Sequence, residues 1–242
     1  MLKNFDTTIS LKGIFSGEHK KPTIVLLLTP VLLTVWKYYG SVSFYHQHLS
    51  SSFILFDNSA LTAEWFHFFS TLILFGVVPL LIIKFLFKEN FSSYGLQFGD
   101  WKLGLKLFFI AAPFLILSTY PSSKMPDFLA EYPFYKNAGI SGTTFFLHSL
   151  MYAFYYIGWE IFFRGFMQFG IRSTFGDWHT VLIQTMASCL VHIGKPDGEI
   201  FSSILGGIVW GIIVFRTRSI WSVFLMHWLL GVSLDFFICF FR

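Results

Sequence analysis

The chain has 242 residues, of which 55% are hydrophobic and only 12% are charged. A soluble domain usually carries about 25% charged residues, so this composition excludes that class and indicates a membrane protein. The net charge of +4 does not indicate nucleic-acid binding, because the basic residues lie between apolar runs, as is typical of loops that orient a membrane protein.

The first 21 residues are polar and mildly basic, and we expect residues 1–21 to lie on the membrane surface. Seven apolar runs follow, each long enough for the roughly 17–25 residues that a spanning helix needs. They lie at about 22–40, 64–87, 103–120, 143–174, 178–194, 199–216 and 219–241. The predicted fold is therefore all-α: a polytopic membrane bundle of about seven transmembrane helices, forming a single domain over residues 22–242. The first run lacks a cleavage site and predicts an uncleaved anchor.

Turn-forming residues separate the later runs, at Gly176-Asp177 and at residues 194–198. Within the sixth run, Ser203, Gly207 and Gly211 recur every four residues. Such a stripe of small side chains allows two helices to approach closely, so we expect it to serve packing.

The positions of lysine and arginine predict the orientation in the membrane. If the N-terminus is in the cytoplasm, the cytoplasmic side holds Lys3, Lys12, Lys20, Lys21, Lys84, Lys88, Lys102, Lys106, Arg172, Arg216 and Arg218. The opposite side then holds Lys37, Lys124, Lys136, Lys195 and Arg242. This excess favours an N-in, C-out topology, which we assign to a bacterial cytoplasmic membrane.

Ionisable side chains interrupt the apolar runs. They are Glu160, Arg164, His192, His227 and Asp235, with Glu199 at the start of the sixth run. A charge near the bilayer centre costs at least roughly 2.5–3.5 kcal/mol, so such residues indicate function by default. The alternative for Glu160 and Arg164, four residues apart, is an ion pair that only joins helices. Two intramembrane histidines favour proton transfer instead.

Distance along the helices predicts which of these side chains meet. Glu160 lies 16 residues before Gly176 and His192 lies 16 residues after it. Both are then roughly 24 Å from that turn, on neighbouring antiparallel helices. We therefore expect Glu160 and His192 to face each other, with Glu199 within reach of a shared water molecule. Such a convergence is what general acid–base chemistry requires.

Three short segments resemble the motifs of a known family. Residues 159–165, Trp-Glu-Ile-Phe-Phe-Arg-Gly, are similar to the Glu-Glu-x-x-x-Arg motif of the CPBP intramembrane proteases, which process prenylated CaaX proteins and bacteriocins (Abi-type). Residues 188–192, ending in histidine, are similar to the second motif, Phe-x-x-x-His, and His227 matches the histidine of the third, His-x-x-x-Asn. The resemblance covers about residues 143–235, and the order and spacing of the motifs agree.

The chain departs from these motifs at three positions. Trp159 replaces the first glutamate, which the family uses with the second-motif histidine to activate water. Ser188 replaces a phenylalanine, and Gly231 replaces the asparagine that helps the third-motif histidine to hold an oxyanion. The residues that the resemblance carries over as catalytic are Glu160, Arg164, His192 and His227.

Two carboxylates can substitute for the missing groups. Glu199 returns to the depth of His192 across the turn at 194–198 and can polarise a water there; alternatively, it only stabilises a helix N-terminus. Asp235 lies two turns beyond His227 and either serves near it or partners another polar group. Glu160 is the other candidate base.

The sequence thus predicts an intramembrane endopeptidase that cleaves membrane-embedded or lipid-anchored peptides, with water activated by a carboxylate and His192. In this predicted mechanism, His227 stabilises the oxyanion and Arg164 orients Glu160. A catalytically inactive relative that acts as a membrane peptide-binding, immunity or scaffold protein stays open. A transporter is the third option, but no inverted repeat supports it.

We predict no cofactor. Two histidines and a carboxylate can bind zinc, but no His-Glu-x-x-His segment is present, and the resemblance implies a glutamate-dependent enzyme. Cys189 and Cys239 both lie in apolar runs and predict neither a disulfide nor a thiolate metal site.

Overall fold

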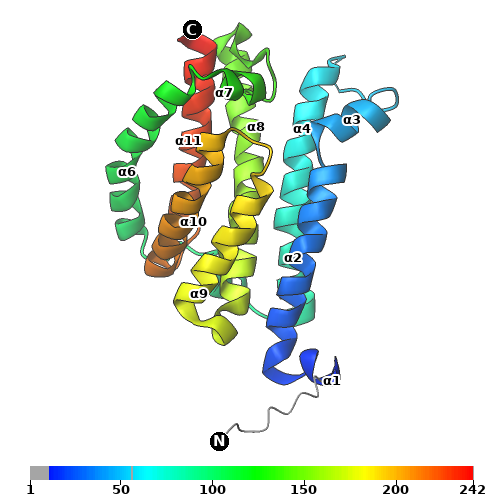
Figure 1. Ribbon diagram of the computed structural model, residues 1–242, viewed down its shortest axis with the longest axis vertical. Coiled ribbons are helices and arrows are strands. Elements are labelled where there is room, and N and C mark those ends of the chain that lie inside the picture. The colour runs from blue at the N-terminus through cyan, green and yellow to red at the C-terminus, as the bar shows by residue number, and fades with distance from the viewer. Residues whose placement is uncertain (1–10, 56, 242) are drawn as a thin grey trace, which may run out of the picture.

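The computed structural model describes residues 11–55 and 57–241, which form helices joined by loops, with no β-strand in this part of the chain (Figure 1). The all-α fold class is therefore confirmed. Of the predicted surface segment, residues 1–10 lie outside the described residues. The remainder forms two short helical turns, α1 (Leu11–Ile14) and η1 (Gly17–His19), and the first residues of α2.

All seven predicted runs are helical, with boundaries that differ by a few residues from those expected. The elements of the N-terminal half are α2 (Lys20–Tyr39), α3 (Val42–His48), α4 (Ser59–Thr71), η2 (Leu72–Val77), α5 (Val78–Leu81), η3 (Ile82–Phe87), η4 (Phe91–Tyr94) and α6 (Trp101–Ser122). The C-terminal half contains α7 (Pro126–Glu131), η5 (Ala138–Ile140), α8 (Gly142–Glu160), η6 (Ile161–Met167), α9 (Gln168–Val191), α10 (Asp197–Thr217) and α11 (Trp221–Phe240).

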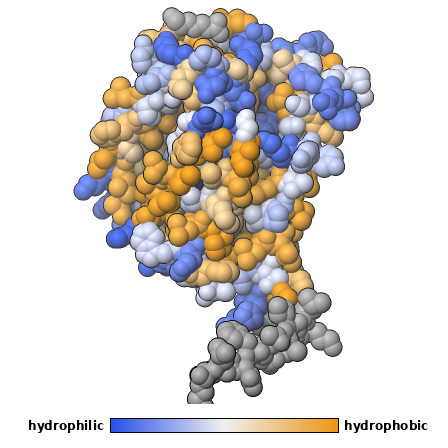
Figure 2. Space-filling model, viewed as in Figure 1, coloured by the Kyte–Doolittle hydropathy of each residue, from blue (hydrophilic) through white to orange (hydrophobic). Residues whose placement is uncertain are grey.

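Five helical stretches within the described residues are long and apolar enough to cross a membrane. They are 17–39, 59–87, 101–122, 197–217 and 221–240. Large apolar side chains such as Phe85, Phe114 and Leu205 are exposed on them, and apolar residues cover the middle of the face shown in Figure 2. Such surface is stable only against hydrocarbon, so the chain is an integral membrane helix bundle.

The other two predicted spans, 143–174 and 178–194, form α8, η6 and α9. This stretch runs from the C-terminal end of the bundle towards the N-terminal end, where Gly176 reverses its direction (Figure 1). Gly176 has φ 69° and ψ 176°, a conformation that a side chain would disfavour, so glycine permits this turn. Helices α10 and α11 then descend and ascend beside α9 and α6.

The stripe of small residues on α10 packs as predicted. A Cβ atom added at Gly207 would lie 2.7 Å from the Thr185 hydroxyl, so a larger residue would push α9 and α10 apart. The close approach also brings backbone carbonyls within reach of buried amides. Gln184 donates to the Gly207 carbonyl at 2.7 Å, and Gln168 donates to that of Gly211 at 2.9 Å. Helix α10 is thereby fixed against α9, which positions the loop between them.

Candidate active site

Glu160 is the last residue of α8 and lies at the centre of a buried polar group. Its Oε1 atom accepts a hydrogen bond from Nδ1 of His227 at 2.7 Å, and its Oε2 atom lies 3.4 Å from Nε of Arg164. Arg164 belongs to the π-helical turn η6, and its guanidinium also lies 5.5 Å from the ring centre of Trp210. The expected pair of Glu160 and Arg164 is thus present, and His227 completes it. π-helical turns of this kind are frequent at functional sites.

His192 directly follows α9 and faces Glu199 in the first turn of α10. Its Nδ1 atom lies 2.6 Å from the Ser188 carbonyl, and its Nε2 atom lies 3.8 Å from Oε1 of Glu199. A carbonyl oxygen only accepts, so Nδ1 carries the proton and the neutral ring presents a lone pair at Nε2. Two acceptors therefore face each other across 3.8 Å, an arrangement that a water molecule satisfies by donating one proton to each.

The indole of Trp159 packs against a histidine of each pair. Its ring centre is 5.4 Å from that of His192 and 6.5 Å from that of His227, edge-on to both. The equal distances from Gly176 predicted that this part of α8 and His192 would share a level in the membrane, and the contact agrees. The residue that departs from the family motif therefore contacts both histidines.

The partner of Glu160 differs from the one expected. We predicted that Glu160 and His192 would face each other, but the Glu160 carboxylate is hydrogen-bonded to His227 and forms an ion pair with Arg164 instead. The helical rise gave the depth of these residues but not their rotation about the helix axes, and the side chain of Trp159 occupies the space beside His192. His192 has Glu199 as its carboxylate neighbour.

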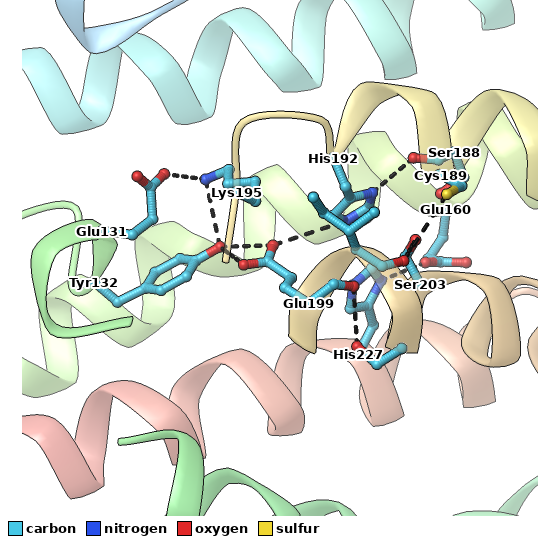
Figure 3. Close-up of polar contacts among 12 residues, drawn as sticks. Glu131, Tyr132, Glu160, Ser188, Cys189, His192, Lys195, Glu199, Ser203 and His227 are labelled. Atoms are coloured by element: carbon cyan, nitrogen blue, oxygen red, sulfur yellow. Dashed lines mark hydrogen bonds and ion pairs between the residues drawn. The ribbon is translucent and has the colours of Figure 1, made fainter. Parts of the chain in front are cut away.

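A second layer of contacts covers Glu199 on the side of the C-terminal end of the bundle. The Tyr132 hydroxyl lies 2.8 Å from both Glu199 oxygens, and Lys195 lies 3.4 Å from the same hydroxyl (Figure 3). Lys195 also forms an ion pair with Glu131 at the end of α7. Burial, and next the Glu199 charge, raise the pKa of Tyr132, so the phenol stays protonated and donates to Glu199.

A pocket of about 680 Å³ adjoins this layer. Glu131, Phe134 and Lys195 form one wall, and Trp36 and His67 are among the residues that line the rest. Glu199, His192 and His227 are each partly exposed, at 21%, 13% and 14% of their side-chain surface, whereas Glu160 is fully buried. The accessible atoms of the site are therefore those of the two histidines and of Glu199.

Asp235 is not part of this site. Its Oδ2 atom lies 2.8 Å from Nε2 of His148, whose Nδ1 atom lies 2.6 Å from Oε1 of Glu64. The alternative that Asp235 partners another polar group is thus correct. Neither His148 nor Glu64 was predicted from the sequence to have a role. Both are ionisable residues within the predicted runs 64–87 and 143–174, so their positions in the sequence could have indicated a role.

The zinc alternative requires three protein ligands that converge on one point. No group of three or more histidine, cysteine, aspartate and glutamate side chains in residues 11–55 and 57–241 is placed to hold a metal ion. Instead, one nitrogen of each histidine is engaged by a protein acceptor, Ser188 for His192 and Glu160 for His227.

Comparison with known families identifies the segment that contains this site. Residues 138–233 match the family model described as Type II CAAX prenyl endopeptidase Rce1-like. The segment runs from η5 into α11 and includes all five candidate residues. The resemblance of this segment to the CaaX-protease family is therefore confirmed, and the matched family is one of membrane proteases. No curated protein and no solved structure matches the chain.

Proposed function

We propose that the protein is an intramembrane endopeptidase that cleaves membrane-embedded or lipid-anchored peptides. The observation that carries the proposal is the presence of two histidine–carboxylate pairs, His192 with Glu199 and His227 with Glu160, that both adjoin Trp159. In each pair one imidazole nitrogen is held by the protein and the other faces the accessible part of the site. Peptide hydrolysis needs one group to activate water and another to stabilise the oxyanion, and the two pairs can supply one each.

The pair of His192 and Glu199 activates the water. A water between Nε2 of His192 and Oε1 of Glu199 has both protons engaged, so its lone pair points away from them towards the substrate carbonyl. As the new C–O bond forms, one proton passes to this pair. The proton is then delivered to the leaving amide nitrogen as the C–N bond breaks, which leaves a carboxylic acid and an amine as products.

The group of His227, Glu160 and Arg164 stabilises the charge on the carbonyl oxygen. Glu160 accepts from Nδ1, which directs Nε2 of His227 towards the site. When His227 is protonated, Nε2 donates to the oxyanion, and the adjacent carboxylate supports the imidazolium. Arg164 holds the second oxygen of Glu160 and so fixes the carboxylate that orients His227. The residues proposed as catalytic are His192, Glu199 and His227, with Glu160 and Arg164 positioning them.

One observation favours a second candidate, an inactive relative that binds a membrane peptide. Trp159 is 98% buried among aromatic rings, so no carboxylate stands at the position that the family uses for water activation. Glu160 does not replace it, because both of its oxygens face protein cations or donors. In this alternative the partly exposed pocket binds a peptide segment and no bond is cleaved.

Cleavage by the purified protein in liposomes distinguishes the two candidates. The substrates are membrane-tethered peptides with and without a prenylated C-terminal cysteine, and the products are identified by mass spectrometry. We expect cleavage by the wild type and none by His192→Ala. A wild type that binds the peptides but leaves them intact over long incubation contradicts the protease proposal and supports the inactive relative.

We also propose that the site opens to the extracytoplasmic side of a bacterial membrane. The loop between α9 and α10 lies towards the C-terminal end of the bundle, opposite the end where α1 lies (Figure 1), and the lysine and arginine count favours N-in. Asp197 is the first residue of α10, and Ser173 lies in α9 just before the turn at Gly176; both are exposed. In intact cells a membrane-impermeant thiol reagent should label Asp197→Cys and not Ser173→Cys. The reverse pattern would contradict this topology.

A further inference from the structure

Gly231 leaves a space on α11 that the side chain of Tyr156 fills. A Cβ atom added at Gly231 would lie 2.0 Å from the Tyr156 hydroxyl oxygen and 2.7 Å from the ring carbon that bears it. Atoms that are not bonded do not approach this closely, so the hydroxyl can occupy this position only because residue 231 is glycine. The end of the Tyr156 side chain is therefore fixed against the backbone of α11.

The same tyrosine packs on His227. The two ring centres are 4.5 Å apart, with an angle of 53° between the planes. Tyr156 lies one turn before Glu160 on α8, and Gly231 lies one turn after His227 on α11, which runs in the opposite direction. The hydroxyl thus lies one helical turn from the Glu160–His227 contact, on the side of the C-terminal end of the bundle.

An oxyanion is stabilised best by two donors aimed at one point, and His227 offers one through Nε2. A side-chain donor in contact with His227 is well placed to be the second. The rings packed on His227 are those of Tyr156, Trp159 and Trp210. Trp210 also packs on the guanidinium of Arg164, and the indole nitrogen of Trp159 is fully buried. Tyr156 has a neutral hydroxyl whose position is fixed by its contact with Gly231.

We infer that the Tyr156 hydroxyl is the second hydrogen-bond donor to the substrate oxygen, beside His227, and that Gly231 serves to admit it. This inference rests on the proposed protease function and adds a catalytic residue to it. It also assigns a purpose to the glycine at position 231, which would otherwise be only a missing side chain. The substrate oxygen would then lie between α8 and α11, with the activated water approaching from α9 and α10.

The test compares two neighbouring tyrosines on the membrane-tethered peptide cleaved by the wild type. Tyr156→Phe should lower kcat by about 10²-fold with little change in KM, because the hydroxyl acts only as charge develops on the oxygen. Tyr155→Phe is the matched control, since Tyr155 is equally buried and loses the same atom; it should stay within about twofold of the wild type. Equal kcat values for the two variants would overturn the inference.

The Gly231→Ala variant provides an independent test of the same inference. The added methyl displaces the hydroxyl without removing it, so kcat should fall to a value similar to that of Tyr156→Phe. The double variant should lose no further activity, because both changes remove the same interaction. Additive losses would show that Gly231 acts by another route and would contradict the assigned role of the glycine.

A spectroscopic measurement separates failure of this inference from failure of the protease proposal. In the ¹⁵N-histidine spectrum, the His227 signals are assigned by their loss in His227→Gln. Tyr156→Phe should shift them and Tyr155→Phe should not, whether or not the wild type cleaves peptides. Absence of wild-type cleavage contradicts the protease proposal, whereas unshifted His227 signals in Tyr156→Phe contradict the placement on which the inference depends.

Discussion

Two groups of histidine and carboxylate side chains lie in this bundle. They differ in whether both nitrogens of each imidazole have a hydrogen-bond partner in the protein. In the closed cluster, formed by Glu64, His148 and Asp235, both imidazole nitrogens are bonded to carboxylates and the histidine is 1% exposed. In the open layer, formed by Glu160, His192, Glu199 and His227, each histidine has one nitrogen engaged and the other facing accessible space.

The difference separates structural from chemical use of the same residue types. Helices α4, α8 and α11 each supply one member of the closed cluster, so His148 joins three helices and has no nitrogen free for a substrate. The histidines of the open layer are oriented by single contacts and keep the atom that can transfer a proton. Ionisable residues in a membrane indicate a function, and the hydrogen-bond partners indicate which kind.

The largest effect is expected for the histidines of the open layer. His192→Ala and His227→Ala should each reduce cleavage by at least about 10³-fold, which corresponds to roughly 4 kcal/mol of transition-state stabilisation. His192 is partly exposed and is held only by a backbone carbonyl, so His192→Ala should leave the thermal unfolding temperature in detergent close to that of the wild type. His227→Ala also removes the hydrogen bond to the buried Glu160 carboxylate and should lower that temperature. Full activity in either variant, measured on the same membrane-tethered peptide, would rule out the mechanism.

The closed cluster should respond in the opposite way. His148→Ala leaves two buried carboxylates without their shared partner, which costs about 3–5 kcal/mol of unfolding free energy. Denaturant titration in mild detergent measures this loss. The variant that remains folded should cleave at nearly the wild-type rate per molecule. A stable but inactive His148→Ala protein would show that the closed cluster takes part in the reaction, and would contradict its assignment as a structural group.

A smaller effect is expected for the carboxylate that polarises the water. Glu199→Gln should lower kcat by about 10²-fold, since general-base catalysis contributes roughly 10²–10⁴-fold and His192 is retained. The matched control is Glu131→Gln, which weakens the nearby ion pair with Lys195 but leaves Glu199 in place. A partly exposed ion pair contributes at most about 1 kcal/mol, so this control should lose little activity. Similar losses in both variants would favour the alternative that Glu199 only stabilises the start of α10.

Sequence patterns were sufficient for the helices and for the level of the site, because hydropathy and helical rise depend on residue order alone. The equal separation of Glu160 and His192 from Gly176 correctly indicated that the end of α8 and His192 share a level, as the contact of Trp159 with His192 shows. The stripe of Gly207 and Gly211 likewise predicted close helix packing, and the structure identifies α9 as the partner. Both inferences need only the period of a helix and the position of one turn.

The pairing of side chains could not be obtained in the same way. It depends on the rotation of each helix, which is set by packing of large residues such as Trp159 and Tyr156. That packing places Glu160 against His227, and it places His192 beside Glu199. The closed cluster was missed for a related reason. His148 and Glu64 are 84 residues apart and have no motif, so only the packing of α4 against α8 brings them together.

The smallest expected effect is that of a chelator on the open layer. Zinc binds to histidine nitrogen at about 2.0–2.1 Å, and a catalytic site usually has three protein ligands that converge on one point. Here Nδ1 of each histidine is already engaged, and the indole of Trp159 packs against both rings. A metal would have to use both Nε2 atoms and Glu199, and would displace the water that the mechanism requires between His192 and Glu199. We therefore expect incubation with EDTA, followed by removal of the chelator, to leave the cleavage rate unchanged. Loss of activity that added zinc restores would show that the two pairs move together around a metal, and would replace the carboxylate-based mechanism.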